Sequence, residues 1–495
     1  MKVLLIYPNI GRHGDIPIAL TVLASVLKAG GHLVDIFDFS HYIPEVTFQS
    51  IQEDYGMFKR PAAPPVAAPI YRSIDNLEKD LADFIKKSNV DIVGITANSG
   101  TYRLGLKCGK FIKKHYREIF MLFGGIHSTL CPDEVIAEDC IDAICIGEGE
   151  DAFLELCDTI EVKKDIYSIK NLWIRDKNNP EIIHKNPLRP LKDLNTLPLQ
   201  DFSGFNEYEF YRALDGKMYK MLNTEISRGC PFECSYCSNK VLRDGFKGLG
   251  NYQRRKNPEI AVKHLKELKE KYQFEIIRFW DEDFTVFPVA YIKELAALYK
   301  KEVNLPFIVY AGTRTITEEK IEYLKKMGCV TIAMAIESGN YWIRKYILNR
   351  NISDEDIIEK YELVKKSGIR VSAYNMIGLP FETRKMVFDT IYLNRKVNAA
   401  TSSVSAYIPY PKTRLAEITK EFGLLKESQS YESLYTSLKS PHLDEDEING
   451  LIKTFSLYVK LPENFFPILE RCEKDELFAK ETFPALLKFL QDENK

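Results

Sequence analysis

The chain has 495 residues, of which 45% are hydrophobic and 12% aromatic, and its formal net charge is -2. A chain of this length is too long to fold around one hydrophobic core, so we expect two large domains and a smaller one. The apolar content excludes extensive disorder. Because positive and negative charges nearly balance, the chain has no long-range electrostatic field that would attract nucleic acid. The longest apolar helix candidate, residues 18–27, is too short for a transmembrane segment. With no signal peptide at its start, we expect a cytoplasmic protein.

The first part of the chain alternates apolar strands with amphipathic helices. Strands are expected over residues 2–7, 32–38, 90–97, 119–123 and 141–146, and helices over 19–29, 74–87, 104–116 and 132–138. Such alternation is typical of a parallel sheet that helices cover on both faces. We expect an α/β fold that begins with a Rossmann-like, doubly wound domain over residues 1–160.

Ligands of doubly wound sheets bind beyond the carboxyl ends of the strands. Polar, turn-prone segments follow three of the expected strands, at residues 8–11, 98–101 and 124–127. The Pro-rich stretch 61–69 cannot form a regular helix and is expected as an extended insertion over this edge. The loop after the first strand lacks G-x-G-x-x-G, which argues against a nicotinamide cofactor.

The second part resumes the alternation for six units after a charged, Pro-rich connector at residues 161–220. Its strands are expected over residues 222–227, 275–281, 306–311, 329–335, 369–376 and 402–408, with helices such as 258–272, 318–327 and 354–367 between them. Six units predict a partial (βα)6 barrel over residues 221–420, with the active site at the carboxyl ends of its strands. Residues 421–495 are expected to form a small, mostly helical C-terminal cap.

Three cysteines stand close together directly after the first barrel strand. Cys230, Cys234 and Cys237 have the spacing C-x3-C-x2-C, which supplies three ligands to a four-iron cluster and leaves one iron open. A zinc site would normally need a fourth ligand, and the nearest later candidate, His264, lies in a helical run. The other seven cysteines are scattered through apolar stretches, so we expect them to be packing residues rather than disulfides.

Polar clusters also end the other barrel strands, at residues 280–284, 312–314, 337–339, 375–383 and 407–411. A single acidic residue after a strand is usually a helix cap, but clusters at every strand end beside a thiolate loop are harder to explain in that way. The order of four segments over residues 222–415 closely resembles that of the radical S-adenosylmethionine enzymes. These segments are the cysteine loop, the acidic end of the second strand, the Glu-Ser-Gly turn and the segment Gly-Leu-Pro-x-Glu-Thr.

This resemblance implies a four-iron, four-sulfur cluster on the three cysteines, with S-adenosylmethionine chelating the open iron. Arg314 would neutralise a carboxylate, since a guanidinium matches that group with two hydrogen bonds. The other residues that the resemblance assigns to S-adenosylmethionine are Asp281 and Glu282 at its ammonium group, Glu337 at the ribose, Gly378, Leu379 and Pro380 at the adenine, and Tyr236 beneath the adenine.

The first domain resembles the cobalamin-binding domain that precedes the radical domain in one branch of this family. The resemblance lies in residues 17–20, 124–129 and 146–150. The motif D-x-H-x-x-G is absent, and neither His13 nor His127 has its spacing, so we expect cobalamin bound without a histidine ligand; a domain that binds none is the alternative. The cobalamin contacts expected from this resemblance and from the sheet edge are Ser99, Thr101, Gly124, Gly125, Ile126, His127, Gly147, Glu148, Gly149 and Glu150.

Together the two resemblances imply a cobalamin-dependent methyltransferase. A 5′-deoxyadenosyl radical would take hydrogen from an unactivated carbon of a small or medium organic substrate, and methylcobalamin would deliver the methyl group. A reducing partner such as flavodoxin or ferredoxin and an oxygen-poor, anaerobic setting are expected. Two alternatives stay open: an oxidative cyclase or rearrangement enzyme with the same cofactors, and an iron–sulfur electron-transfer or sensing protein.

Overall fold

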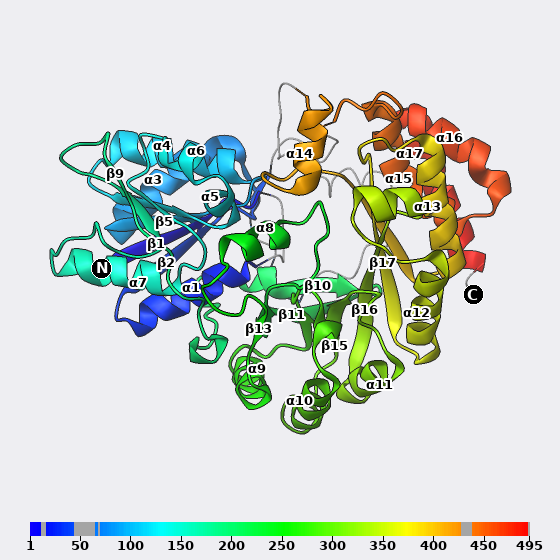
Figure 1. Ribbon diagram of the computed structural model, residues 1–495, viewed down its shortest axis with the longest axis horizontal. Coiled ribbons are helices and arrows are strands. Elements are labelled where there is room, and N and C mark those ends of the chain that lie inside the picture. The colour runs from blue at the N-terminus through cyan, green and yellow to red at the C-terminus, as the bar shows by residue number, and fades with distance from the viewer. Residues whose placement is uncertain (11–15, 44–64, 68–69, 427–437, 494–495) are drawn as a thin grey trace.

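The computed structural model describes residues 1–10, 16–43, 65–67, 70–426 and 438–493. Two seven-stranded sheets with their helices form the two halves of the molecule (Figure 1). The expected insertion at residues 61–69 lies largely outside the described residues, and His13 lies outside them as well.

The N-terminal sheet is a doubly wound parallel sheet with an antiparallel extension. Its order is β2-β1-β5-β6-β7-β8-β9, and the strands are β2 (Leu33–Asp38), β1 (Lys2–Tyr7), β5 (Ile92–Thr96), β6 (Phe120–Gly124), β7 (Ala143–Cys145), β8 (Leu172–Arg175) and β9 (Ile183–Lys185). The first five strands pair in parallel, and β8 and β9 add antiparallel. The order reverses between β1 and β5, which is where ligands bind in such sheets.

Alternating side chains along each strand build one core on either face of this sheet. Val3 and Leu5 face α1 (Ile18–Ala29) and α7 (Glu150–Glu161). Leu4 and Ile6 face the helices of the opposite layer, which are α3 (Leu77–Ser88), α4 (Tyr102–His115) and α6 (Pro132–Ile136). The expected coverage of both faces is confirmed. Short α5 (Ile126–Leu130) and the pair β3 (Tyr42–Ile43) and β4 (Arg72–Ser73) complete this half.

The second sheet is the expected partial barrel of six parallel strands, preceded by an antiparallel edge strand. In order the strands are β10 (Tyr211–Leu214), β11 (Lys217–Thr224), β14 (Ile276–Phe279), β15 (Phe307–Ala311), β16 (Cys329–Glu337), β17 (Arg370–Ile377) and β18 (Thr401–Ala406). Pairing is parallel from β11 to β18. A separate small ladder joins β12 (Ser227–Arg228) to β13 (Arg254–Arg255).

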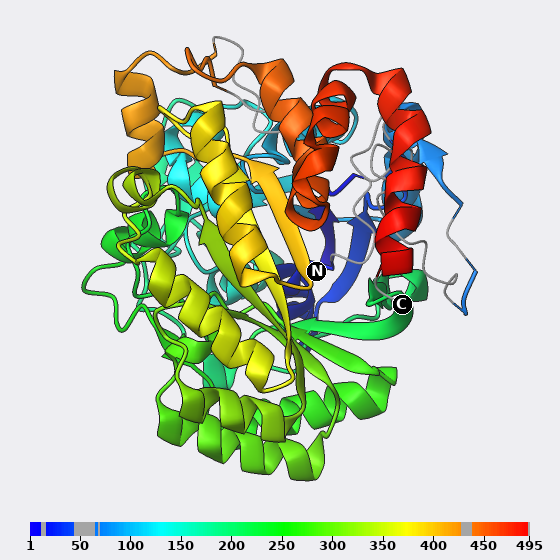
Figure 2. The same ribbon diagram turned by 90° about the vertical axis from the view of Figure 1, so that its right-hand side faces the viewer.

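Helices cover the outer face of the barrel, as Figures 1 and 2 show. They are α9 (Pro258–Tyr272), α10 (Val289–Glu302), α11 (Glu318–Met327), α12 (Asp354–Lys366) and α13 (Arg384–Val397). Two shorter helices lie elsewhere: α8 (Ser238–Gly245) lies between the two halves, and α14 (Arg414–Glu421) lies at the top of Figure 1. Several of the outer helices begin where the sequence supplies a cap: Thr317, Ser353 and Thr383 accept from a backbone N–H of the first turn. These caps fix where each helix leaves the rim, and hence how long each rim loop is.

Three further helices, α15 (Glu445–Lys460), α16 (Phe466–Lys474) and α17 (Glu476–Glu493), pack beside α13 and β18 at the far end of the barrel (Figure 2). Residues 161–220, expected as a connector, contribute strands to both sheets. Phe202, Phe205 and Phe210 of this segment belong to one continuous core that runs from the N-terminal sheet into the barrel. Among the described residues, no helix is long and apolar enough to cross a membrane.

Candidate functional site

The loop that carries the three cysteines is held by backbone contacts on both sides. Gly229 has a φ of +92°, and a Cβ there would lie 2.3 Å from the carbonyl oxygen of Tyr252, so only glycine fits. Ser235 N–H donates to the carbonyl of Leu348 at 3.1 Å, and Leu415 N–H donates to the carbonyl of Ser235 at 2.9 Å. The loop is thus positioned by the rim segments that follow β16 and β18.

All three thiols on this loop are free and partly exposed. Burial raises the pKa of Cys230 to about 12 and also raises the pKa of Cys237. Cys234 is an electrostatic neighbour of both thiols and raises the pKa of each further. Hydrogen-bond donors approach two of the sulfurs: Arg350 Nη1 lies 3.7 Å from Cys234 Sγ, and Asn239 Nδ2 lies 3.7 Å from Cys237 Sγ. A cationic cluster supplies the charge that turns such thiols into thiolates, so this donor set fits iron.

Tyr236 connects the cysteine loop to the end of β16. Its hydroxyl donates to Glu337 Oε1 at 2.7 Å, and Arg350 Nη1 lies 3.5 Å from the same hydroxyl. Burial, reinforced by the Glu337 charge, raises the pKa of Tyr236. Glu337 itself has a φ of +65°, an uncommon conformation for a non-glycine residue that turns the chain at the strand end. Two residues assigned to different parts of S-adenosylmethionine thus lie in direct contact.

The three acidic residues after β14 lie in different environments. Asp281 is buried, accepts from Ile226 N–H at 3.2 Å and from the Ser227 hydroxyl, and so holds the turn below the cysteine loop; burial raises its pKa to about 8. Asp283 is also buried and accepts from the side chains of Thr285 and Thr315. Glu282 is the exposed member of the three. The resemblance assigns Asp281 and Glu282 to the ammonium group of S-adenosylmethionine. That role stays a prediction for both Asp281 and Glu282.

The turn after β17 is built around a buried carboxyl group. Gly378 and Leu379 donate their N–H groups to Glu382 Oε2 at 2.7 and 3.1 Å, and Leu379 and Pro380 are themselves buried. Burial raises the pKa of Glu382 to about 8. Arg314, after β15, places its guanidinium 5.5 Å from the ring centroid of Phe232 in the cysteine loop. Both rim segments expected to contact S-adenosylmethionine therefore lie at the same end of the barrel as the cysteines.

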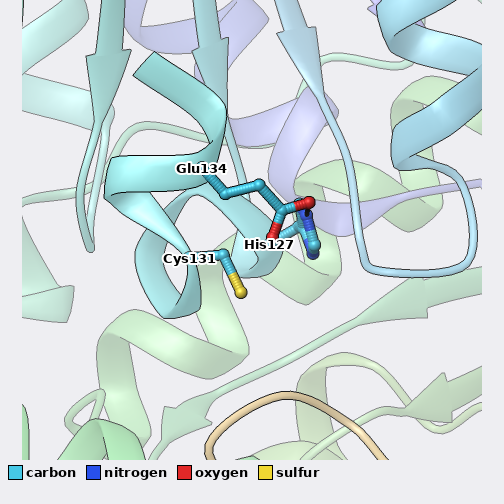
Figure 3. A group of neighbouring side chains, drawn as sticks. All are labelled: His127, Cys131 and Glu134. Atoms are coloured by element: carbon cyan, nitrogen blue, oxygen red, sulfur yellow. Dashed lines mark ion pairs between the residues drawn. The ribbon is translucent and has the colours of Figure 1, made fainter. Parts of the chain in front are cut away.

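At the edge of the N-terminal sheet, His127 is the best-connected of the expected residues. It is buried, its Nδ1 lies 3.0 Å from Ser99 Oγ, and its ring centroid lies 4.1 Å from that of Tyr102, with the two rings tilted by 32°. Figure 3 shows Cys131 and Glu134 beside it, and ligand atoms of the three lie within 4.8 Å of one another. Burial lowers the pKa of His127 and raises the pKa of Cys131 to about 11, so both groups are neutral at neutral pH.

Other expected cobalamin contacts at this edge serve the local fold. Gly125 has a φ of +89°, and a Cβ there would lie 2.6 Å from the carbonyl oxygen of Ala97. Thr101 exchanges hydrogen bonds with Asn98. Gly124 accepts from the Ser128 hydroxyl at its carbonyl, Ile126 begins α5, and Gly149 precedes α7. These contacts bring the two loops after β5 and β6 together, as a large ligand at this edge requires.

Glu148 and Glu150 join the two halves of the protein. Arg228, two residues before Cys230, contacts Glu148 at 3.0 Å and Glu150 at 2.8 Å, and Arg254 contacts Glu148 at 2.7 Å. Although burial opposes it, the Arg254 and Arg228 guanidinium groups hold the pKa of Glu148 at about 2. Gly147 packs on Phe246 of the barrel half. The segment expected to bind cobalamin is therefore anchored directly to the cysteine loop.

Two arginines of this site were not expected from the sequence. Arg350 lies outside every motif, in the segment after the turn that follows β16, and carries no sequence signal of its own. Arg254 belongs to an Arg-Arg pair that forms β13, and in sequence such a pair looks like solvated surface charge. Only the fold places Arg350 beside Cys234 and Arg254 beside Glu148.

Two family models match this chain. The Radical SAM superfamily matches residues 224–392, and the B12 binding domain matches residues 68–157. The first range contains the cysteine loop, Glu337 and the turn after β17. The second contains the edge residues from Ser99 to Glu150.

Named relatives cover most of the chain. An uncharacterized methyltransferase of Pyrococcus horikoshii is 28% identical over 389 residues, which are 77% of this chain and 82% of that protein. An anaerobic magnesium-protoporphyrin IX monomethyl ester cyclase of Rubrivivax gelatinosus is 23% identical over 478 residues, which are 90% of this chain and 75% of that protein.

Solved structures share the fold. The radical S-adenosylmethionine methyltransferase TsrM from Kitasatospora setae superposes with a TM-score of 0.63 at 16% identity, covering 94% of this chain and 84% of that one. The cobalamin-dependent S-adenosylmethionine radical enzyme OxsB gives a TM-score of 0.64 at 13% identity, covering 97% and 72%.

Proposed function

This chain is a radical S-adenosylmethionine enzyme with a B12-binding domain, and on that premise we propose that it methylates an unactivated carbon of a small or medium organic substrate. The cofactors are a four-iron, four-sulfur cluster, S-adenosylmethionine and cobalamin. When bound, they supply a hydrogen-abstracting radical from S-adenosylmethionine and a methyl carrier in cobalamin. Similarity to a methyltransferase over 77% of the chain supports methyl transfer as the outcome.

One observation carries this proposal. Arg228 belongs to the segment that leads into Cys230, and its guanidinium contacts Glu148 and Glu150 at the edge of the N-terminal sheet. The cluster loop and the edge matched by the B12 domain are therefore in direct contact. A methyl carrier and a radical source must reach the same substrate atom, and this contact holds their two binding edges together.

The residues of the chain would then act by binding, orienting and excluding water. Cys230, Cys234 and Cys237 hold the cluster, with Arg350 donating toward one sulfur. Tyr236 and Glu337 orient the nucleoside part of S-adenosylmethionine, and exposed Glu282 meets its ammonium group. At the other edge, Ser99, His127 and the Gly124–Gly125 turn face the cobalamin.

The radical chemistry needs an electron from outside the chain. We infer a small reducing protein of the flavodoxin or ferredoxin class as the donor, a cytoplasmic location and an oxygen-poor setting, because a cluster with an open iron at a partly exposed loop is sensitive to oxygen. A test is reduction of the reconstituted cluster by reduced flavodoxin and, separately, by reduced ferredoxin under anaerobic conditions. Failure of both protein classes to reduce it would overturn this inference.

The proposal is tested by product analysis of protein reconstituted anaerobically with iron, sulfide and cobalamin. S-adenosylmethionine with a deuterated methyl group is supplied together with reductant and a small-molecule cell extract. Methyl transfer predicts both 5′-deoxyadenosine and S-adenosylhomocysteine, with the label in an extract component. Cleavage to 5′-deoxyadenosine with no S-adenosylhomocysteine would contradict methyl transfer.

That second outcome favours the other candidate function, a cyclase or rearrangement enzyme with the same cofactors. Its support is the similarity to the magnesium-protoporphyrin IX monomethyl ester cyclase over 90% of this chain. Absence of any S-adenosylmethionine cleavage under strong reductant would instead favour an electron-transfer or sensing protein.

A further inference from the structure

The inner face of the barrel carries large aromatic side chains that remain open to solvent. Along β14, β15 and β17, the residues that face the outer helices are buried in the core, for example Phe279, Val309 and Ala373. Their neighbours Trp280, Tyr310 and Tyr374 point to the opposite, concave face. Trp280 is 39% exposed and Tyr374 is 38% exposed, which is unusual for aromatic residues that belong to or border central strands.

These three rings form one continuous surface, which we name the aromatic wall. The Trp280 and Tyr310 centroids lie 5.3 Å apart at an interplanar angle of 30°, and those of Tyr310 and Tyr374 lie 6.1 Å apart. Between them runs β16, which pairs Ala333 with Tyr310 and Ala335 with Tyr374. Because the two β16 residues at these positions are alanines, no bulky side chain of β16 interrupts the wall there.

The wall is firmly positioned and lies next to the cofactor site. Trp280 Nε1 donates to Asn223 Oδ1 at 3.1 Å, and Trp280 N–H donates to the carbonyl of Thr224 at 2.8 Å. Trp280 immediately precedes Asp281, which holds the turn under the cysteine loop. At the other end of the wall, Ala335 lies two residues before Glu337, and its carbonyl accepts from Arg350 Nη2 at 3.0 Å.

A cation accompanies the wall. Arg278 lies two residues before Trp280 on the same face of β14, and its guanidinium carbon is 5.4 Å from the Trp280 ring centroid. Its Nε is buried with no hydrogen-bond partner, and within the described part of the chain no carboxylate forms an ion pair with it. A guanidinium inside a barrel that pairs with none of the described carboxylates is a natural partner for a carboxylate or phosphate of a ligand.

We propose that the aromatic wall and Arg278 bind the substrate, and that the substrate class is a planar, conjugated organic anion. The flat side of the molecule stacks on Tyr310 and Tyr374, and its anionic group reaches Arg278. This inference rests on the proposed function in that the stacked molecule is the one attacked by the radical. It orients the substrate with its far edge toward Glu337 and the cysteine loop.

The test uses the reconstituted holoenzyme and three probes matched in size. Naphthalene-2-carboxylate is planar and anionic, 2-naphthalenemethanol is planar and neutral, and decahydronaphthalene-2-carboxylate is anionic but not planar. Binding is measured by calorimetry in the presence of S-adenosylmethionine. We expect naphthalene-2-carboxylate to bind about tenfold more tightly than either of the other two, since it alone makes both contacts.

Variants assign each preference to its residue. Arg278→Met is expected to remove the preference for the carboxylate over the alcohol, and Arg278→Lys to restore part of it, which separates lost charge from lost fold. Tyr374→Leu is expected to weaken both naphthalenes about fivefold and to leave the decahydronaphthalene unchanged. Tyr392→Leu is the control, because Tyr392 on outer helix α13 is 40% exposed and does not touch the wall.

Equal binding of the three probes would overturn the proposal, and so would unchanged binding in both the Arg278→Met and the Tyr374→Leu variants. Iron content and cleavage of S-adenosylmethionine are measured in the same samples. A protein that binds the probes as expected but forms no S-adenosylhomocysteine when it is given the small-molecule cell extract and reductant would contradict the proposed methyl transfer and leave the wall in place. The two failures are thus distinguishable.

Discussion

The barrel rim and the edge of the N-terminal sheet differ in the kind of residue that is expected to bind the cofactor. At the rim, the cofactor is expected to be held by side chains that can do little else: three free thiols, a tyrosine paired with a carboxylate, and an arginine beside a sulfur. At the sheet edge, the expected contacts are turns, glycines and polar residues already bonded to one another, such as Ser99 with His127. Reactive side chains such as clustered thiols therefore indicate a site from the sequence alone. Glycines and turn residues do not, because the same residues are also needed for the fold.

The largest expected effect tests the rim alone. Cys234→Ala should remove the cluster and reduce 5′-deoxyadenosine to background, because two thiols do not hold a four-iron cluster, while cobalt content stays unchanged. Iron and cobalt are counted after anaerobic reconstitution, and nucleosides are measured by chromatography. Cys472→Ala is the control, since Cys472 is a buried packing residue of α16. Cleavage that survived in the Cys234 variant would refute the cluster assignment.

The next effect concerns the contact between the two regions. Glu148→Gln removes the carboxylate that pairs with Arg254 and one of the three carboxylates around Arg228, which keeps Glu150 and Glu225. This change should lower the free energy of unfolding by about 2–4 kcal/mol. Urea denaturation measures this loss, and Glu322→Gln, in an exposed pair with Lys326, should cost under about 0.5 kcal/mol. A loss no larger than that of the control would mean that Glu148 does not join the halves.

The same pair predicts a pH dependence. The pKa of Glu148 is held at about 2 in the folded protein, against about 4.3 when unfolded. Its contribution to stability is fully present above about pH 5 and is lost as the pH falls toward about 2. The difference in urea midpoint between the wild type and Glu148→Gln should therefore shrink from pH 7 to pH 3. A constant difference would contradict the ion pair.

A smaller effect isolates the sheet edge. Gly125→Ala is compared with Gly31→Ala, because both glycines have a φ of +89°. At position 125 the ψ of -173° puts the backbone in a region that is essentially limited to glycine, and the new methyl group would lie 2.6 Å from Ala97 O, whereas at position 31 it would meet no atom within 4 Å. The Gly125 variant should lose about 1–3 kcal/mol more stability than the Gly31 variant, and it should lose cobalamin while retaining iron. Retention of cobalamin in the Gly125 variant would remove this turn from the cofactor site.

The smallest effect concerns one hydrogen bond at the rim. Tyr236→Phe removes the donor to Glu337 and should weaken binding of S-adenosylmethionine about fivefold, with the iron content unchanged. Equilibrium dialysis measures the affinity. Tyr361→Phe removes a comparable bond, to the carbonyl of Met334 at 2.8 Å on the outer face of β16, and should leave the affinity unchanged. Equal effects in the two variants would indicate a general loss of packing.

Much of this architecture follows from local patterns in the sequence. Apolar strands and amphipathic helices predicted both sheets, and the spacing of Cys230, Cys234 and Cys237 predicted a cluster loop that the structure places at the barrel rim. The pattern did not reveal that Asp281 is buried, because a strand-end acid and a turn-holding acid look alike in sequence. Nor did it reveal Arg350, Arg254 or the aromatic wall, since these depend on which distant strands become neighbours.

The central claim is that one chain combines a radical source with cobalamin to transfer a methyl group. Its most direct measurement is the pair of products formed from deuterium-labelled S-adenosylmethionine by the fully reconstituted protein in a cell extract. Methyl transfer predicts 5′-deoxyadenosine, S-adenosylhomocysteine and a labelled methyl group in one extract component. Without cobalamin, only 5′-deoxyadenosine should still form. Formation of 5′-deoxyadenosine alone in the presence of cobalamin would contradict methyl transfer.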